Sequence, residues 1–295
     1  SRGEAIGTQR AILHGEPIII GGTPAPLDMW RNRILFPALL EGTGRMVPLS
    51  ENIRYLLLRW ATASLAVFVF WHTLVSAGAA GRRAAAMGVA LLCTGLLITF
   101  LSFGLEIPSD FPDVAFTAAF LLATLKHRRG WLLAMAILGA ANRESAAYAG
   151  IIWAAVHGLE GRLRWKEIGF GFVVSVLSYA VTLGLRQGYG IDMGSNQQLL
   201  AVSRILLSVE FFLASPGLTS WPILALWMFG VPLVLIVRGW RQLEPVDHRI
   251  LIATAATTLI TVLFGLIHEL RVFLPDVTLL AYVAARTMRN PPCVE

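Results

Sequence analysis

Three consecutive polar residues, Asn142, Arg143 and Glu144, interrupt the apolar stretch of residues 131–156 and are the first candidates for chemistry. An ionised side chain at membrane depth is costly unless it is paired or hydrated, so such residues usually mark a site. Arg143 could bind an anion, and Glu144 could orient it or accept a proton. The alternative is a buried ion pair that holds a turn. Because adjacent residues on a helix do not face each other, we expect each to have a partner elsewhere in the chain.

A second pair of candidates, Asp110 and Asp113, lies in the sequence Pro-Ser-Asp-Phe-Pro-Asp. The two prolines predict an extended or turning loop before a helix over residues 114–125. Asp113 has a structural use as the N-cap of that helix. Asp110 has less local explanation and is our candidate for a general base. With Glu106 nearby, the two carboxylates could also bind a divalent cation, although no complete set of metal ligands is visible.

Charged residues at the ends of other apolar runs could bind a phosphate or a lipid headgroup. These candidates are Arg31, Arg33, Glu269 and Arg271. Arginine makes bidentate contacts to phosphate, and a lipid headgroup is the anion expected near a membrane surface. Glu269 could balance the charge of Arg143 or Arg271. For Arg31 and Arg33, ordinary contact with lipid is the alternative.

The composition predicts an integral membrane protein. The 295 residues are 56% hydrophobic and 14% charged, whereas a soluble domain carries about 25% charged residues. The apolar runs are continuous rather than alternating, which predicts helices and not a β-barrel. The net charge of +6 does not indicate nucleic acid binding, because the basic residues cluster between apolar runs. Cys93 and Cys293 match no metal or redox spacing.

Several apolar runs approach the roughly 20 residues that a helix needs to span a bilayer, so we expect an all-α, polytopic transmembrane bundle. The expected spans are residues 55–77, 84–104, 168–185, 221–237 and 250–267, with shorter segments at 114–125 and 272–285. The chain starts at Ser1 with no initiator Met and no early apolar run, and we expect further residues to precede it.

Basic clusters between the spans predict their orientation. They lie at residues 82–83, 126–129, 162–166, 238–249 and 286–289. If all of them face the cytoplasm, the positive-inside rule holds throughout. The clusters on both sides of residues 131–156 then lie on one side, so this segment must be a hairpin of two short helices with Asn142, Arg143 and Glu144 at its turn. The alternative is one long tilted helix with an internal ion pair, which would reverse every later span.

A hairpin would gather polar residues from distant regions on the opposite, outer face. That face would hold residues 1–54, 105–113, 186–220 and 268–271. Within it we expect an interfacial helix at residues 34–40 and an amphipathic one at residues 197–214. We therefore divide the chain into an outward-facing segment of residues 1–54, a transmembrane domain of residues 55–290 and a tail of residues 291–295.

Four short motifs occur in order along the chain. They are Arg-Asn-Arg-Ile-Leu-Phe-Pro at 31–37, Pro-Ser-Asp-Phe-Pro-Asp at 108–113, Asn-Arg-Glu-Ser at 142–145 and His-Glu-Leu-Arg at 268–271. With them the chain resembles bacterial integral-membrane proteins of the GT-C glycosyltransferase superfamily, in which an Arg-x-Leu-x-Pro entry segment and an Asn-Arg-Glu-Thr/Ser motif recur. The resemblance implies a multi-helix fold in the bacterial inner membrane and a polyprenyl-phosphate-linked sugar as donor. It also implies an acidic base in a periplasmic loop after the first span and, in some members, a divalent metal ion.

A transferase of this kind would use an acid–base group and cationic stabilisation of the leaving lipid phosphate. The candidates are Asp110 and Glu144 for catalysis, and Arg31, Arg33, Asp113, Arg143, Glu269 and Arg271 for substrate binding. Two other classes stay open. One is a non-catalytic accessory or scaffold subunit of a larger membrane complex, with structural ion pairs. The other is a transporter with a broken helix at mid-membrane, which the absence of an inverted repeat disfavours.

Overall fold

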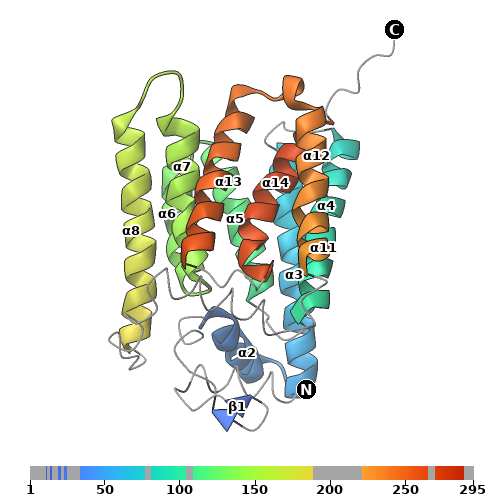
Figure 1. The fold of residues 1–295 in the computed structure, drawn as a ribbon. Helices are drawn as coiled ribbons and strands as arrows, with labels where there is room; N and C mark the ends of the chain where they lie inside the picture. The colour runs from blue at the N-terminus through green and yellow to red at the C-terminus, as the bar shows by residue number, and fades with distance from the viewer. Residues whose placement is uncertain are drawn as a thin grey trace.

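The computed structural model describes residues 34–76, 81–103, 109–188, 221–264 and 270–288, with a few positions between residues 11 and 24. Within these ranges the fold is an all-α bundle, accompanied by one short antiparallel pair of strands, β1 (Ile19–Ile20) and β2 (Thr23–Pro24). The α-helices are α2 (Leu35–Met46), α3 (Glu51–Ser76), α4 (Arg82–Phe103), α5 (Asp110–Leu125), α6 (Arg129–Ala140), α7 (Tyr148–Gly158), α8 (Trp165–Gly188), α11 (Trp221–Ala225), α12 (Val231–Arg238), α13 (Pro245–Phe264) and α14 (Leu274–Arg286). Figure 1 shows all of them except α2 packed lengthwise in one bundle, with α2 beneath its lower end.

The chain is an integral membrane protein. Four of the described helices, α3, α4, α8 and α13, are long and apolar enough to cross a membrane. Their surfaces expose large apolar side chains, among them Trp60, Phe68, Phe172 and Leu259. Water does not stabilise apolar surface of this extent, whereas lipid does. The predicted class of fold is therefore confirmed.

Two short helices form the centre of the bundle. Every residue of α14 is buried, and so are most residues of α5. The two helices pack against each other, and α3, α4, α6, α7 and α13 pack around them. Because protein rather than lipid surrounds them, α5 and α14 do not need the length of a full span.

The segment of residues 131–156 is the predicted hairpin. Helix α6 runs to Ala140, the chain turns through Asn142 and Arg143 into the short 3₁₀ helix η2 (Glu144–Ala147), and α7 returns beside it (Figure 1). One long tilted helix, the alternative prediction, is wrong. As a result, the basic ends of the helices lie together at the upper end of the bundle in Figure 1, as the positive-inside rule requires of one membrane side.

Glycines allow the hairpin to pack closely on α8. A Cβ atom on Gly150 would lie 1.9 Å from the carbonyl oxygen of Gly171, and one on Gly171 would lie 2.4 Å from that of Gly150. The Ser175 hydroxyl also donates a hydrogen bond to the carbonyl oxygen of Ala147, at 2.8 Å. Small residues of this kind let helix backbones approach each other inside a membrane. This contact holds the hairpin against α8, a helix long and apolar enough to span the bilayer.

The predicted span at residues 221–237 is interrupted. Between α11 and α12 lies a π-helical turn, η4 (Leu226–Gly230). Pro232 has no N–H, so the carbonyl four residues before it cannot receive the usual helical hydrogen bond. A π turn next to a proline accommodates such a gap without ending the helix.

Candidate functional site

Helix α5 begins earlier than the sequence predicts. We expected a loop through residue 113 with Asp113 as the N-cap, but α5 starts at Asp110 and its N-cap is Ser109. The reason is that Pro112 lies in the first turn, where the missing N–H has no helical partner to lose. Asp110 and Asp113 therefore both lie in the first turn, where the helix dipole favours negative charge. Their spacing of three residues places them on the same face of the helix.

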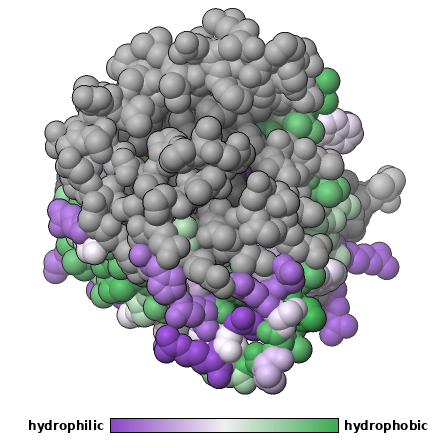
Figure 2. Space-filling model, turned by 90° about the horizontal axis from the view of Figure 1, so that it is seen from below, coloured by the Kyte–Doolittle hydropathy of each residue, from purple (hydrophilic) through white to green (hydrophobic). Residues whose placement is uncertain are grey.

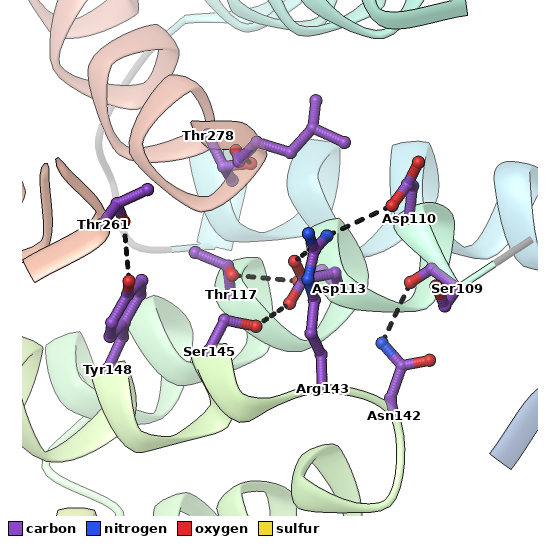
Figure 3. Close-up of polar contacts among 11 residues, drawn as sticks. Ser109, Asp110, Asp113, Thr117, Asn142, Arg143, Ser145, Tyr148, Thr261 and Thr278 are labelled. Carbon is purple, nitrogen blue, oxygen red and sulfur yellow. Dashed lines mark hydrogen bonds and ion pairs between the residues drawn. The ribbon is translucent and has the colours of Figure 1, made fainter. Parts of the chain in front are cut away.

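Arg143 reaches this face from the turn of the hairpin. Arg143 is the N-cap of η2, and its backbone is extended, with φ −164° and ψ 156°. Its Nη1 lies 3.1 Å from Oδ1 of Asp110 and 3.3 Å from Oδ2 of Asp113. The three side chains are only 6%, 4% and 5% exposed. Figure 3 shows Arg143 between the two carboxylates.

Hydroxyl and amide groups complete this buried network. The hydroxyl of Ser145 donates to Oδ1 of Asp113, and the hydroxyl of Thr117 donates to the backbone carbonyl of Asp113 at 2.9 Å. Asn142 Nδ2 donates to the carbonyl oxygen of Ser109, also at 2.9 Å. We call Ser109, Asp110, Asp113, Asn142, Arg143 and Ser145 the hairpin-tip network (Figure 3).

The entry segment also contacts the hairpin. The backbone N–H of Leu35, at the start of α2, donates to the carbonyl oxygen of Ala141 at 3.0 Å. Contacts among described residues thus join two of the four sequence motifs, 108–113 and 142–145, through Arg143 and the two aspartates. Motif 31–37 reaches the same turn through the backbone of Leu35, which contacts Ala141 beside motif 142–145. The expected convergence of polar residues at the end of the hairpin is observed for motifs 108–113 and 142–145.

The predicted interfacial helix at residues 34–40 corresponds to α2, which is longer than expected. Phe36 and Leu40 are buried against Tyr55 of α3, whereas Arg45 is exposed. This two-sided pattern is typical of a helix at a membrane interface. Figure 2 views this end of the molecule, and the described residues along its edge mix hydrophilic and hydrophobic side chains.

Among the described residues, the network places two carboxylates around one guanidinium. Arg143 was proposed as an anion-binding group, and its ion pairs within the described residues are with Asp110 and Asp113. The expectation that Arg143 has its partners outside its own motif is confirmed. Glu144 begins η2, is partly exposed, and does not share these ion pairs.

The remaining predicted site residues divide into two groups. Arg271 lies in the 3₁₀ helix η6 (Leu270–Phe273) at the start of α14, and it is buried. Arg31, Arg33 and Glu269 lie outside the described residues, as does the predicted amphipathic helix at residues 197–214.

Sequence reasoning missed several polar residues of this region. The hydroxyl groups of Tyr148 on α7 and Thr261 on α13 lie 2.6 Å apart. Asp276, in the first turn of α14, is completely buried, and its Oδ1 lies 2.5 Å from the hydroxyl of Thr257. Single hydroxyls in apolar helices give no sequence signal. Asp276 does give one, because it is a carboxylate inside an apolar run, the same anomaly that identified Arg143.

No metal centre is formed by the part of the chain that the structure describes, where no three His, Cys, Asp or Glu side chains are grouped to hold an ion. The sequence suggested a divalent cation between Asp110 and Asp113. The guanidinium of Arg143 lies at that position. Comparisons of the chain with protein-family models, with curated proteins and with solved structures find no match.

Proposed function

We propose that this chain is a membrane glycosyltransferase of the GT-C kind, which takes its sugar from a polyprenyl-phosphate-linked donor. The observation that carries the proposal is the direct contact between two of the motifs on which the resemblance rests, with the entry segment beside them. Arg143 of Asn-Arg-Glu-Ser binds both aspartates of Pro-Ser-Asp-Phe-Pro-Asp, and Leu35 of the entry segment binds the adjacent backbone. Motifs that are far apart in the sequence and lie together at one end of the bundle support one shared site.

The network has a chemical use in such a reaction. Asp110 would accept the proton of an acceptor hydroxyl as its oxygen bonds to the anomeric carbon of the sugar. The bond from that carbon to the phosphate oxygen would break, and polyprenyl phosphate would leave. Arg271, at the same end of the bundle, would stabilise the negative charge that develops on the phosphate. Arg143 would hold Asp110 and Asp113 in place.

The expected location follows from the same arrangement. The basic ends of the helices lie opposite the hairpin-tip network, so the positive-inside rule assigns the network to the outer side. In the inner membrane of a bacterium this side is the periplasm, where a flipped polyprenyl-phosphate sugar would be available in the lipid.

One observation favours a second candidate, a non-catalytic accessory subunit of a larger membrane complex. The charged members of the network are almost fully buried and pair with one another. Such a network can hold the tip of the hairpin to α5 without binding any substrate.

A transfer assay separates the two candidates. The protein is purified from native membranes, its bound lipids and proteins are identified by mass spectrometry, and it is reconstituted with labelled polyprenyl-phosphate sugars. An enzyme should release polyprenyl phosphate, and Asp110→Asn should abolish release while the protein stays folded. The matched control is Glu160→Gln, a partly exposed carboxylate at the opposite end of the hairpin, which should retain activity. Stoichiometric copurification with other membrane subunits, with no turnover of any donor, would support the accessory role and contradict the enzyme.

A further inference from the structure

The structure contains a second buried carboxyl group, Asp276, which the proposed reaction does not use. Asp276 lies on α14, at the end of the bundle that holds the hairpin-tip network, and its exposure is 0%. Its Oδ2 is buried and has no hydrogen-bond partner among the described residues. No described Arg, Lys or His nitrogen lies within ion-pair distance of it, which distinguishes it from Asp110 and Asp113.

The contact between Oδ1 and the hydroxyl of Thr257 bears on whether the carboxyl group of Asp276 is protonated or ionised. The hydroxyl of Thr257 lies 2.5 Å from Oδ1, but it also lies 3.0 Å from the carbonyl oxygen of Thr254 and 3.1 Å from that of Ala253. A hydroxyl has one proton to donate. If Thr257 donates it to a carbonyl of its own helix, the short contact with Asp276 needs a proton on the carboxyl. Thr258 is the next hydroxyl of α13 to interact with this group.

Charged groups at this end of the bundle come from three described elements packed against α14. Helix α5 brings Asp110 and Asp113, and η6 brings Arg271. Helix α3 carries Glu51, Arg54 and Arg59 near its start. The charged residues of α4, α12 and α13 lie at the opposite end of the bundle. Asp113 repels a negative charge on Asp276. The first turn of α14 and the hydroxyls of Thr257 and Thr258 favour such a charge, but an ionised carboxylate that is fully buried and has no cationic partner among the described residues remains costly.

We propose that Asp276 is a proton-binding site, which holds a proton at neutral pH and thereby keeps a third negative charge away from Asp110 and Asp113. Release of the proton would place a negative charge opposite Asp113 and weaken the hairpin-tip network. The inference does not depend on the glycosyltransferase proposal, because it rests on the burial and partners of Asp276 alone.

Infrared spectroscopy of the purified protein in lipid tests the proposal. At neutral pH the wild-type protein should show the carbonyl band of a protonated carboxylic acid, and Asp276→Asn should remove it. The matched control is Asp247→Asn: Asp247 is equally buried between α13 and α14, but it lies 2.8 Å from Arg286 and should be ionised. This control should leave the acid band unchanged. Loss of an ionised carboxylate band in Asp276→Asn, with no change in the acid band, would overturn the proposal.

A second variant keeps the test valid if Asp276→Asn does not fold. Thr257→Val removes the hydroxyl that accepts the carboxyl proton and should move the acid band to higher frequency, because the carbonyl bond of a carboxyl group that donates no hydrogen bond is stiffer. An acid band that does not move would contradict the assignment. Thermal stability of the wild-type protein that rises with sodium concentration, and does not do so in Thr257→Val, would overturn it in favour of a bound metal cation.

Discussion

Asn142 and Ser109 are joined by a hydrogen bond of 2.9 Å although 33 residues separate them in the sequence. Asn142 lies at the turn of the hairpin and Ser109 is the N-cap of α5, so the bond fixes the turn to the start of a central helix. The ion pairs of Arg143 with Asp110 and Asp113 join the same turn to the same helix. The turn of the hairpin is therefore held by polar groups, in a bundle whose other helix contacts are mainly apolar.

Loss of the arginine should destabilise the protein. Arg143→Ala leaves two buried carboxylates without their cation, and breaking a buried pair in this way costs about 3–5 kcal/mol. Arg143→Lys retains the positive charge and should lower the free energy of unfolding by less than Arg143→Ala does. The control, Arg164→Ala, removes an exposed pair with Glu160 and should cost about 0–1 kcal/mol. Thermal unfolding in detergent measures all three.

An unchanged unfolding temperature for Arg143→Ala would contradict the described ion pairs. The large expected loss of stability also means that Arg143→Ala cannot distinguish an enzyme from a scaffold. Asp110→Asn is the better variant for that purpose, since it removes one carboxylate and leaves Arg143 paired with Asp113.

The contact between α7 and α8 offers a prediction with a closely matched control. Gly171→Ala should cost about 1–3 kcal/mol, because its Cβ would meet the backbone oxygen of Gly150 at 2.4 Å. Gly169→Ala lies two residues earlier on the same helix, where a Cβ meets nothing within 4 Å. It should be neutral or stabilise the helix by about 1 kcal/mol. Equal unfolding temperatures for the two variants would contradict the close packing of these helices.

The hairpin can be tested by labelling from one side of a sealed membrane. In a background without Cys93 and Cys293, single cysteines at Arg128 and Arg162 should react with an impermeant thiol reagent from the same side. A cysteine at Arg45, on α2, should react from the opposite side, because α2 lies at the other end of the bundle (Figure 1). If the cysteines at Arg128 and Arg162 reacted from opposite sides, the segment between them would cross the membrane once.

Much of the fold could be predicted from the sequence because membrane helices are set by composition and length. The apolar runs predicted the bundle, and the basic clusters on both sides of residues 131–156 predicted the hairpin. The start of α5 was missed because prolines at 108 and 112 predict a loop, whereas a proline in the first turn of a helix loses no hydrogen bond. The π turn before Pro232 has no sequence signal beyond the proline itself.

The candidate site could be predicted only in part. Arg143, Asp110 and Asp113 were recognisable as charges within or beside apolar runs, and a partner for Arg143 outside its motif was expected from helix geometry. Which residue would be the partner depends on how α5 and the hairpin pack, and that is a tertiary contact across 33 residues. Ser145 and Thr117 were missed because a single hydroxyl resembles many others in such helices.

The most direct measurement of the central claim, that Arg143 binds Asp110 and Asp113 across the hairpin tip, is a double-mutant cycle between Arg143→Gln and Asp113→Asn. The account predicts strong coupling: Arg143→Gln alone should be severely destabilised, and adding Asp113→Asn should recover part of the loss, because it removes a buried charge that has lost its partner. Additive effects of the two substitutions on the free energy of unfolding would contradict the account.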